Sequence, residues 1–291
     1  MAQRWKVTVL MSVYNGGESI RTAVESILNQ TYSNFEFLIV DDGSTDDTPD
    51  VLRSLVTEDS RIRVVRNRSN LGLGGSLNRG VAEARGELVA RMDADDISHP
   101  ERLERQVEFL TREPSVDVVG TQAVDIDSAG NLLASRSAPM THQAICRLIP
   151  WTNPMIHPSV MFRRQAIIAV GSYDARLRYA EDYDLWFRCI AGGLKFANLP
   201  DCLLAYRVGG SNFKKRGWAY RKTEILVRLN GCKALGLNTV RWISALIPLG
   251  LYGVGLIREQ YTRFVYSLAK KLDPREHSPS MVMAAAQWLK R

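Results

Sequence analysis

Cysteine is scarce in this chain of 291 residues, and the four cysteines that occur are widely spaced. Cys146, Cys189, Cys202 and Cys232 form no CxxC pair, which excludes the usual spacing of a zinc site or a redox motif. A disulfide framework is typical of small secreted domains that are dense in cysteine. We therefore expect reduced thiols and a cytoplasmic location for the catalytic part of the protein.

Long hydrophobic runs are also missing. The apolar run near the N-terminus, Val7–Val13, is too short for the core of a signal peptide and has the length of a strand. Trp242–Ile257 has sixteen uncharged residues between Arg241 and Arg258, but Pro248 and three glycines interrupt it. Because a membrane-spanning helix needs about 20 apolar residues, this segment is too short to cross a bilayer.

Acidic residues are rare in the last part of the chain. Residues 206–291 contain 16 Lys/Arg and 4 Asp/Glu, a net charge of +12, whereas the rest of the chain has a net charge of −5. A basic segment around the uncharged Trp242–Ile257 is typical of a segment that lies at the surface of an anionic membrane. The alternative is a buried hairpin of short helices that bends at Pro248 and Gly250. The acidic body disfavours nucleic acid as a partner.

The first 120 residues alternate between strand-like and helix-like segments. The expected strands are Lys6–Val13, Phe35–Val40, Arg61–Arg66, Glu87–Met92 and Val116–Gly120, and the expected helices are Glu18–Asn29, Asp46–Leu55, Gly74–Ala84 and Pro100–Arg112. This order predicts an α/β fold with a mostly parallel, Rossmann-like central sheet and helices on both faces. We expect a basic helical extension, residues 208–291, to follow this body.

Three acidic clusters indicate the chemistry. Asp41–Asp42 follows the apolar run Phe35–Val40, Asp93–Asp96 follows Leu88–Met92, and Glu181–Asp182 is the third cluster. Carboxylates that follow parallel strands meet at the C-terminal edge of the sheet, where open α/β sheets bind ligands. Like charges at one edge are costly unless a cation neutralises them, so the pattern predicts a divalent metal and a phosphorylated substrate.

Seven short motifs carry a family resemblance. They are SVYN (Ser12–Asn15), DDGSTD (Asp41–Asp46), NLG (Asn70–Gly72), ARG (Ala84–Gly86), DADD (Asp93–Asp96), HPSVMFRR (His157–Arg164) and ED (Glu181–Asp182). In order and spacing the series resembles glycosyltransferase family 2, the inverting, nucleotide-sugar-dependent enzymes with the GT-A fold. The resemblance implies a GT-A catalytic domain over residues 1–207. Its nucleotide-sugar-binding half would be residues 1–120 and its acceptor-side half residues 121–207.

The resemblance implies that Ser12 and Tyr14 line the nucleotide base. Tyr14 would offer an aromatic face to the base, although a tyrosine there can also simply cover the sheet edge. Asp42 resembles the acid that accepts a hydrogen bond from the base imide, which favours uracil or thymine donors over rings that present only acceptors. Asp41 is expected to build the turn before Gly43.

The DADD motif contains the family's DxD. Residues two apart in an extended strand point the same way, so Asp93 and Asp95 can face the nucleotide together. The resemblance implies that Asp93 lies near the ribose and that Asp95 binds Mg²⁺ or Mn²⁺ at the diphosphate. Asp96 either supports this site or caps the helix that begins near Pro100.

The remaining motif residues belong to the acceptor side. The resemblance implies that Asp182 is the catalytic base that takes the proton of an acceptor hydroxyl, and the alternative for Glu181–Asp182 is stabilisation of a helix dipole. His157 is expected near the diphosphate and the acceptor pocket, although a lone histidine is more often structural. Arg207 is expected to steady the pyrophosphate leaving group.

The function implied is that of an inverting glycosyltransferase. It would move a sugar from a nucleotide-sugar, with UDP expected, to a saccharide or a lipid-linked saccharide in cell-surface polysaccharide biosynthesis, at the inner face of the membrane. A sugar-phosphate nucleotidyltransferase stays open, although such enzymes usually carry a glycine-rich basic loop where this chain has Ser12–Asn15. A non-catalytic GT-A scaffold subunit is the third possibility, but it would have lost acids such as Asp42, Asp93 and Asp182.

Overall fold

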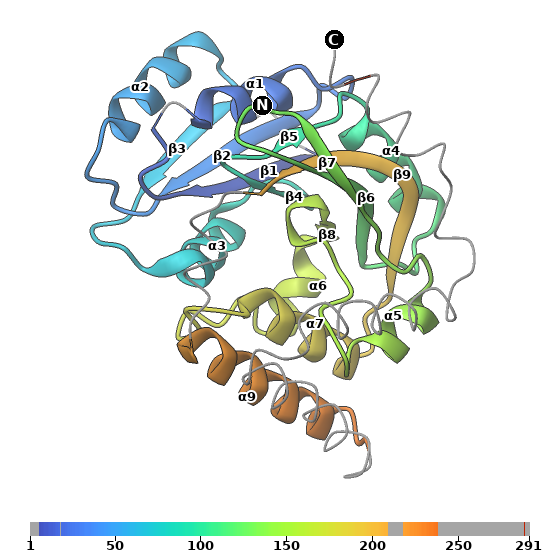
Figure 1. Cartoon of the computed structure of the whole chain (residues 1–291). Helices are drawn as coiled ribbons and strands as arrows, with labels where there is room; N and C mark the ends of the chain where they lie inside the picture. The colour runs from blue at the N-terminus through green and yellow to red at the C-terminus, as the bar shows by residue number, and fades with distance from the viewer. Residues whose placement is uncertain (1–5, 18, 209–217, 238–287, 289–291) are drawn as a thin grey trace.

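The computed structural model of the chain describes residues 6–17, 19–208, 218–237 and 288. Its strands are β1 (Val7–Val13), β2 (Phe35–Asp41), β3 (Ile62–Arg66), β4 (Leu88–Asp93), β5 (Ile97–Ser98), β6 (Val118–Ile126), β7 (Leu132–Arg136), β8 (Met161–Arg163) and β9 (Phe196–Arg207). They form one sheet with the order β3-β2-β1-β4-β8-β6-β9-β5, and β7 pairs with β6 (Figure 1).

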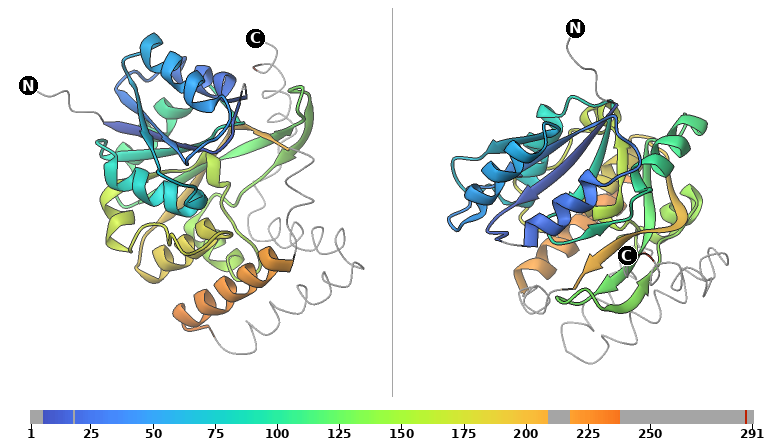
Figure 2. Two further views of the ribbon diagram at one scale, coloured as in Figure 1. Left: turned by 90° about the vertical axis from the view of Figure 1, so that its left-hand side faces the viewer. Right: turned by 90° about the horizontal axis from the view of Figure 1, so that it is seen from above.

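The helices cover both faces of this sheet. They are α1 (Ser19–Leu28), α2 (Thr48–Glu58), α3 (Gly72–Glu83), α4 (Arg102–Arg112), α5 (His142–Leu148), the short 3₁₀ helix η1 (His157–Ser159), α6 (Arg164–Ala169), α7 (Glu181–Ala191) and α9 (Trp218–Ala234). In Figures 1 and 2, α1 and α2 lie on one side of the sheet, and α3, α6 and α7 lie on the other.

The alternation of side chains along β1 explains this layering. Val9 and Met11 point to the face that α1 covers with Val24, whereas Leu10 points to the opposite face and joins the core cluster that contains Trp186 of α7. Successive side chains of a strand point to opposite faces, so a strand that is buried at nearly every position, as β1 is, must be covered on both sides. The central sheet is therefore a buried layer between two helical layers.

The sheet changes character after β4. Strands β1, β2, β3 and β4 are all parallel, as the alternating sequence pattern predicts. Beyond them β8 is antiparallel to β4 and to β6, β9 is parallel to β6, and β5 is antiparallel to β9. The strands and helices predicted in the first 120 residues are all present, with ends shifted by up to three residues except in β6, which continues to Ile126.

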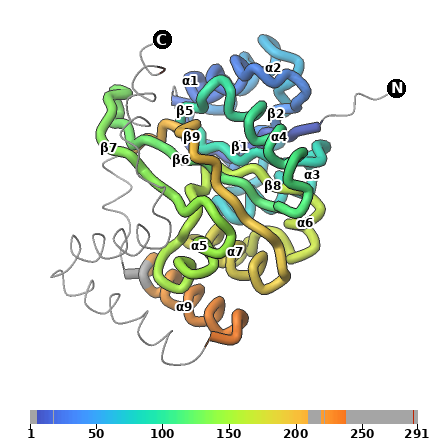
Figure 3. Tube along the Cα trace, turned by 90° about the vertical axis from the view of Figure 1, so that its right-hand side faces the viewer, coloured from blue at the N-terminus to red at the C-terminus, as the bar shows by residue number. Residues whose placement is uncertain are grey.

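Helix α9 belongs to the expected C-terminal extension and packs along α7 (Figures 1 and 3). The guanidinium carbon of Arg228 lies 5.7 Å from the centre of the Tyr183 ring. Gly231 approaches Phe187 so closely that a Cβ at position 231 would be 2.2 Å from the ring. The beginning of the extension is therefore part of the packed body.

The apolar segment Trp242–Ile257, for which we expect contact with lipid, lies outside the described residues. Among the helices that the structure does describe, none combines the length and the apolar character that crossing a bilayer demands.

Candidate active site

The C-terminal ends of β1, β2 and β4 carry the residues predicted to bind the nucleotide. Ser12 is in register with Asp93 of β4, and Val13 is in register with Asp41 of β2. Tyr14 follows directly after β1, and its side chain is 48% exposed. Parallel pairing therefore brings the first two acidic clusters to the same edge of the sheet, as the sequence pattern predicts.

Asp42 is buried at this edge and holds the loop that precedes α3. Its carboxylate accepts hydrogen bonds from the Asn67 amide at 2.7 Å, from the backbone N–H of Leu71 at 2.8 Å and from that of Gly72 at 2.9 Å. A carboxylate offers about four acceptor positions, so one position stays available to a ligand. The neighbouring Asp41 accepts from the backbone N–H of Ser44 at 2.9 Å, which is a turn-building contact.

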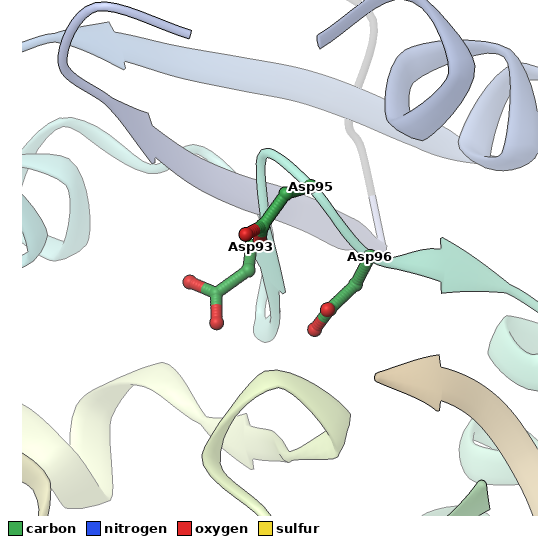
Figure 4. A group of neighbouring side chains, drawn as sticks. All are labelled: Asp93, Asp95 and Asp96. Carbon is green, nitrogen blue, oxygen red and sulfur yellow. The ribbon is translucent and has the colours of Figure 1, made fainter. Parts of the chain in front are cut away.

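Asp93, Asp95 and Asp96 gather in the turn between β4 and β5. One carboxylate oxygen from each lies within 4.8 Å of the other two, and Figure 4 shows the three side chains extending from the turn. Burial, and then the charge of Asp93, raise the pKa of Asp95 to about 6. Burial and the charges of Asp93 and Asp95 raise the pKa of Asp96 well above its usual value.

This turn has the features of a site for a hard divalent cation. Such cations bind carboxylate oxygens, and the Oδ2 atom of Asp96 is buried without a hydrogen-bond partner in the described part of the chain. A cation would satisfy that oxygen and would offset the burial and the mutual repulsion that raise the pKa values of Asp95 and Asp96. The donor set therefore fits the predicted Mg²⁺ or Mn²⁺.

Arg91 is a buried cation beside the acidic turn that was not predicted from the sequence. Its side chain is 2% exposed and forms an ion pair with Asp93. Its Nε and Nη1 atoms have no hydrogen-bond partner among the described residues. Burial disfavours the charged guanidinium, but Asp93, Tyr173 and Asp96 together outweigh burial and raise the pKa of Arg91. Residues 91 and 93 point to the same face of β4, which allows this ion pair. The signal for Arg91 in the sequence was a single charged residue inside an otherwise apolar strand.

The charge of Arg91 also reaches the acidic pair at the start of α7. It lowers the pKa values of Glu181 and Asp182, although burial of both carboxyl groups outweighs it. Burial, followed by the charge of Asp182, raises the pKa of Glu181 to about 8. One buried guanidinium thus forms an ion pair in the acidic turn and also acts electrostatically on the ED pair.

Asp182, the predicted base, is fixed in orientation by two hydrogen bonds. Its Oδ2 accepts from the Asn153 amide at 2.6 Å, and its Oδ1 accepts from the backbone N–H of Tyr183 at 2.8 Å. Burial raises the pKa of Asp182, which makes the carboxylate a stronger proton acceptor. Ala180, the residue before α7, has the left-handed backbone φ of 57°, so the chain turns sharply just before the ED pair.

His157 lies on the acceptor side, next to Asp182. Its Nε2 is 2.8 Å from the Tyr173 hydroxyl oxygen, and its Nδ1 is 3.9 Å from Oδ2 of Asp182. Burial, and then the charge of Arg91, hold the pKa of His157 well below its usual value. His157 is therefore neutral at pH 7, and its contact with Asp182 is a contact between a neutral ring and a carboxylate.

Arg207, at the end of β9, lies against the acidic turn. Its backbone N–H donates to Oδ1 of Asp96 at 2.8 Å, and its Nε donates to the backbone oxygen of Asp95 at 2.8 Å. The structure thus brings Arg207 together with the DADD motif and His157 together with Asp182. Neither Asn153 nor Tyr173 belonged to a motif, and only the fold reveals that they contact these residues.

Comparison with known proteins identifies the sequence family. The model of "Glycosyl transferase family 2" matches residues 8–171. EpsE of Bacillus subtilis, named as a glycosyltransferase, is 33% identical over 247 residues, which cover 84% of this chain and 88% of EpsE. The amylovoran biosynthesis glycosyltransferase AmsE of Erwinia amylovora is 36% identical over 224 residues, 75% of this chain and 82% of AmsE. The O-antigen biosynthesis glycosyltransferase WbnJ of Escherichia coli is 32% identical over 219 residues, 74% of this chain and 84% of WbnJ.

Solved structures share the fold. TarS of S. aureus (residues 1–349) in complex with UDP-GlcNAc superposes with a TM-score of 0.65 at 18% identity, over 98% of this chain and 90% of that chain. The mannosyltransferase PcManGT of Pyrobaculum calidifontis, in complex with GDP-Man and Mn²⁺, has a TM-score of 0.60 at 20% identity, over 98% of this chain and 80% of that chain. The GT-A fold expected from the motifs is confirmed.

Proposed function

This chain belongs to glycosyltransferase family 2, and from that membership we propose that it is an inverting enzyme that transfers a sugar from a UDP-sugar to a saccharide or a lipid-linked saccharide. The observation that carries the proposal is that the buried Arg91 interacts with two groups of acids, through an ion pair with Asp93 and through the effect of its charge on Asp182. In the first group Asp93, Asp95 and Asp96 can hold a metal-bound diphosphate. In the second group Asp182 can accept a proton.

On the donor side, Ser12, Tyr14 and Asp42 would bind the nucleoside. The carboxylate of Asp42 keeps one acceptor position, which suits the N–H of uracil. UDP-GlcNAc in the TarS complex supports a UDP-sugar as the donor. Asp93 would lie at the ribose and Asp95 would bind Mg²⁺ or Mn²⁺, which, when bound, offsets the charge of the diphosphate.

On the acceptor side, Asp182 would remove the proton from an acceptor hydroxyl. The hydroxyl oxygen then forms a bond to the anomeric carbon while the bond from that carbon to the diphosphate oxygen breaks and the nucleoside diphosphate leaves with the electron pair. One displacement of this kind inverts the anomeric configuration. Asn153 holds the carboxylate from one side, and neutral His157 lies close to it without adding a competing positive charge.

The names of AmsE and WbnJ support a role in the biosynthesis of a surface polysaccharide. The net charge of +12 over residues 206–291 supports a location at the inner face of the membrane, because anionic lipid attracts such a segment. The acceptor would then be presented at that surface, as a lipid-linked saccharide is.

The test is incubation of the purified protein with radiolabelled UDP-sugars, Mn²⁺ and a lipid extract that contains lipid-linked saccharides. We expect transfer of label to the lipid fraction and release of UDP, with the opposite anomeric configuration in the product by NMR. Exchange of label between UTP and a sugar phosphate would instead identify a nucleotidyltransferase. A protein that neither transfers nor exchanges label with any donor would be a scaffold subunit.

A further inference from the structure

The guanidinium of Arg207 is surrounded by main-chain oxygens. Its Nε donates to the Asp95 carbonyl oxygen at 2.8 Å, and its Nη1 donates to the carbonyl oxygens of Asp127 at 2.8 Å and Ser128 at 2.9 Å. The backbone N–H of the same residue donates to Oδ1 of Asp96 at 2.8 Å. Four hydrogen bonds of Arg207 therefore end on two turns of the chain.

These two turns differ in the contacts that hold them. The turn at Asp127 is fixed by its own side chain, which accepts from the backbone N–H groups of Ala129 and Asn131 at 2.9 and 2.8 Å. The turn that carries Asp95 and Asp96 contains three carboxylates that repel one another. Arg207 thus connects a turn under electrostatic strain to a turn that is already fixed, at the end of the strand β9 that also pairs with β5.

We propose that Arg207 is a positioning residue for the metal-binding turn, which holds the main chain of Asp95 and the carboxylate of Asp96 in the arrangement that a divalent cation requires. The inference rests on the proposed function, because it takes Asp95 as the metal ligand. The guanidinium acts through the turn and does not itself coordinate the metal. A planar guanidinium can donate to three carbonyl oxygens in different directions, whereas the ammonium of a lysine is a compact charge at the end of a flexible stem.

This role differs from contact with the pyrophosphate. The side chain of Arg207 is half-buried, so a direct contact with a phosphate oxygen is the competing role. The two roles differ in what they affect. A positioning residue determines metal affinity before any nucleotide arrives, whereas a phosphate contact determines nucleotide affinity and depends mainly on the positive charge.

The experiment measures Mn²⁺ binding to the nucleotide-free full-length protein by EPR, for the native protein, Arg207→Met and Arg207→Lys. Residues that orient metal ligands typically change metal affinity by about 10- to 100-fold when replaced, and we expect a loss in this range for both variants. Binding of UDP in excess EDTA should stay within about threefold of the native value. The matched control is Arg163→Met, since the Arg163 guanidinium also donates to main-chain oxygens, those of Val116 and Leu110, and Arg163 is in register with Leu88 at the opposite end of β4 from the acidic turn. Its Mn²⁺ affinity should stay native.

Two results would overturn the inference. In the first, Arg207→Met binds Mn²⁺ with native affinity but binds UDP more weakly in EDTA, and Arg207→Lys binds UDP with native affinity. This result would mean that Arg207 contacts a phosphate directly. The other is native Mn²⁺ and UDP affinity in both variants. Thermal melts show whether each variant folds, and Arg207→Lys keeps the stem and the charge if Arg207→Met does not fold. Failure of the proposed function is distinguishable, because a protein without transferase activity would still give these Mn²⁺ affinities.

Discussion

Asp182 combines two properties that a general base needs, a fixed orientation and a raised pKa. The Asn153 amide and the Tyr183 backbone N–H hold its two oxygens, while burial raises the pKa of the carboxyl group. A raised pKa increases proton affinity, but it also moves the acidic limit of activity upward, because only the ionised form accepts a proton. We therefore expect kcat/KM to fall on acidification at a higher pH than for an exposed aspartate.

Replacement of this base should separate binding from turnover. Asp182→Asn keeps the shape of the side chain and removes the proton acceptor, so we expect turnover to fall by about 10²–10⁴ while UDP affinity stays native. Steady-state rates and isothermal titration with UDP measure the two quantities. Asp184→Asn, two residues further along α7, is the control and should keep most of the activity. Near-native turnover in Asp182→Asn would place the base elsewhere.

Loss of a metal ligand should affect binding as well as turnover. We expect Asp95→Ala to abolish transfer and to weaken UDP binding in the presence of Mn²⁺, because Asp95 is one of the three carboxylates of the acidic turn. Binding of UDP in EDTA should change little. Full activity of the native protein in excess chelator would contradict the metal requirement.

Glu181 should make stability depend on pH. Its pKa is about 8 in the folded protein, compared with an ordinary value of 4.5, so the folded state favours the protonated form. The stability that the folded protein gains from protonated Glu181 is fully present below about pH 4.5 and is lost as the pH rises through about 8. We therefore expect Glu181→Gln, which is neutral at every pH, to melt at a higher temperature than the native protein at pH 8.5.

Near pH 5 the native protein and Glu181→Gln should melt at similar temperatures, because Glu181 is then largely protonated in the folded protein. Glu108→Gln is the matched control, since Glu108 is exposed on α4. Its replacement should leave the difference between the melting temperatures at the two pH values as it is in the native protein. Thermal melts followed by circular dichroism at both pH values would measure this. Equal melting temperatures of Glu181→Gln and the native protein at pH 8.5 would contradict the raised pKa.

The sequence predicts the ends of strands well but not the contacts across the site. Asp93 could be placed because it follows an apolar run that reads as a strand, whereas Asp182 was singled out only through the ED motif of the family resemblance. Asn153 and Tyr173 could not, because they lie in segments without periodicity and meet Asp182 and His157 only through the tertiary fold. Arg91 lay inside an apolar strand, where a single charge was the only indication.

At the scale of elements, α9 packs against α7, the helix that carries the proposed base Asp182. A Cβ at position 231 would lie 2.2–2.4 Å from three ring atoms of Phe187, so the Phe187 ring or one of the two helices must move when Gly231 is replaced. We expect Gly231→Ala to reduce the free energy of unfolding by about 1–3 kcal/mol, measured by urea denaturation. It should also lower turnover, because a shift of α7 moves Asp182.

Lys222→Ala is the matched control for this prediction. Lys222 is exposed on the same helix, and such surface substitutions usually change stability by less than about 0.5 kcal/mol. Native stability of Gly231→Ala would mean that the close contact between the two helices is not maintained in solution.

The parallel strands β1 to β4 were readable because each is an apolar run followed by a helix with a 3.6-residue period. The antiparallel strands β5, β7 and β8 were not predicted. β5 has two residues and β8 has three, which is too short for an alternating pattern to show. β7 is largely exposed, so it lacks the apolar alternation that marks a half-buried strand.

At the scale of the whole molecule, the charge asymmetry predicts membrane association. The full-length protein should sediment with anionic vesicles. High salt should release part of it, because the Debye length is about 8 Å at physiological ionic strength and shorter above it, and detergent should release more. A chain that ends at Leu237 keeps α9 and its packing on α7, so it should stay folded and lose vesicle binding. Equal sedimentation with and without vesicles would contradict the prediction.

The fold class could be predicted because alternating strands and helices form a parallel sheet. The ends of its strands then indicate where the residues predicted to bind the nucleotide lie. The acceptor side depends on packing between distant segments. The boundary expected at residue 207 illustrates the difference: composition changes there, but α9 continues the packed body through Arg228 and Gly231. The change in net charge near residue 207 therefore does not coincide with the end of the packed core.

The contact between Arg207 and Asp96 also has a consequence for biosynthesis. The two residues are 111 positions apart. Since ribosomes add about 5–20 residues per second, Arg207 is joined to the chain about 6 to 22 s after Asp96. During that interval β1 to β4 and their helices can already form, but the acidic turn lacks its partner on β9. The nascent chain therefore contains its parallel strands well before its acidic turn can be held by Arg207.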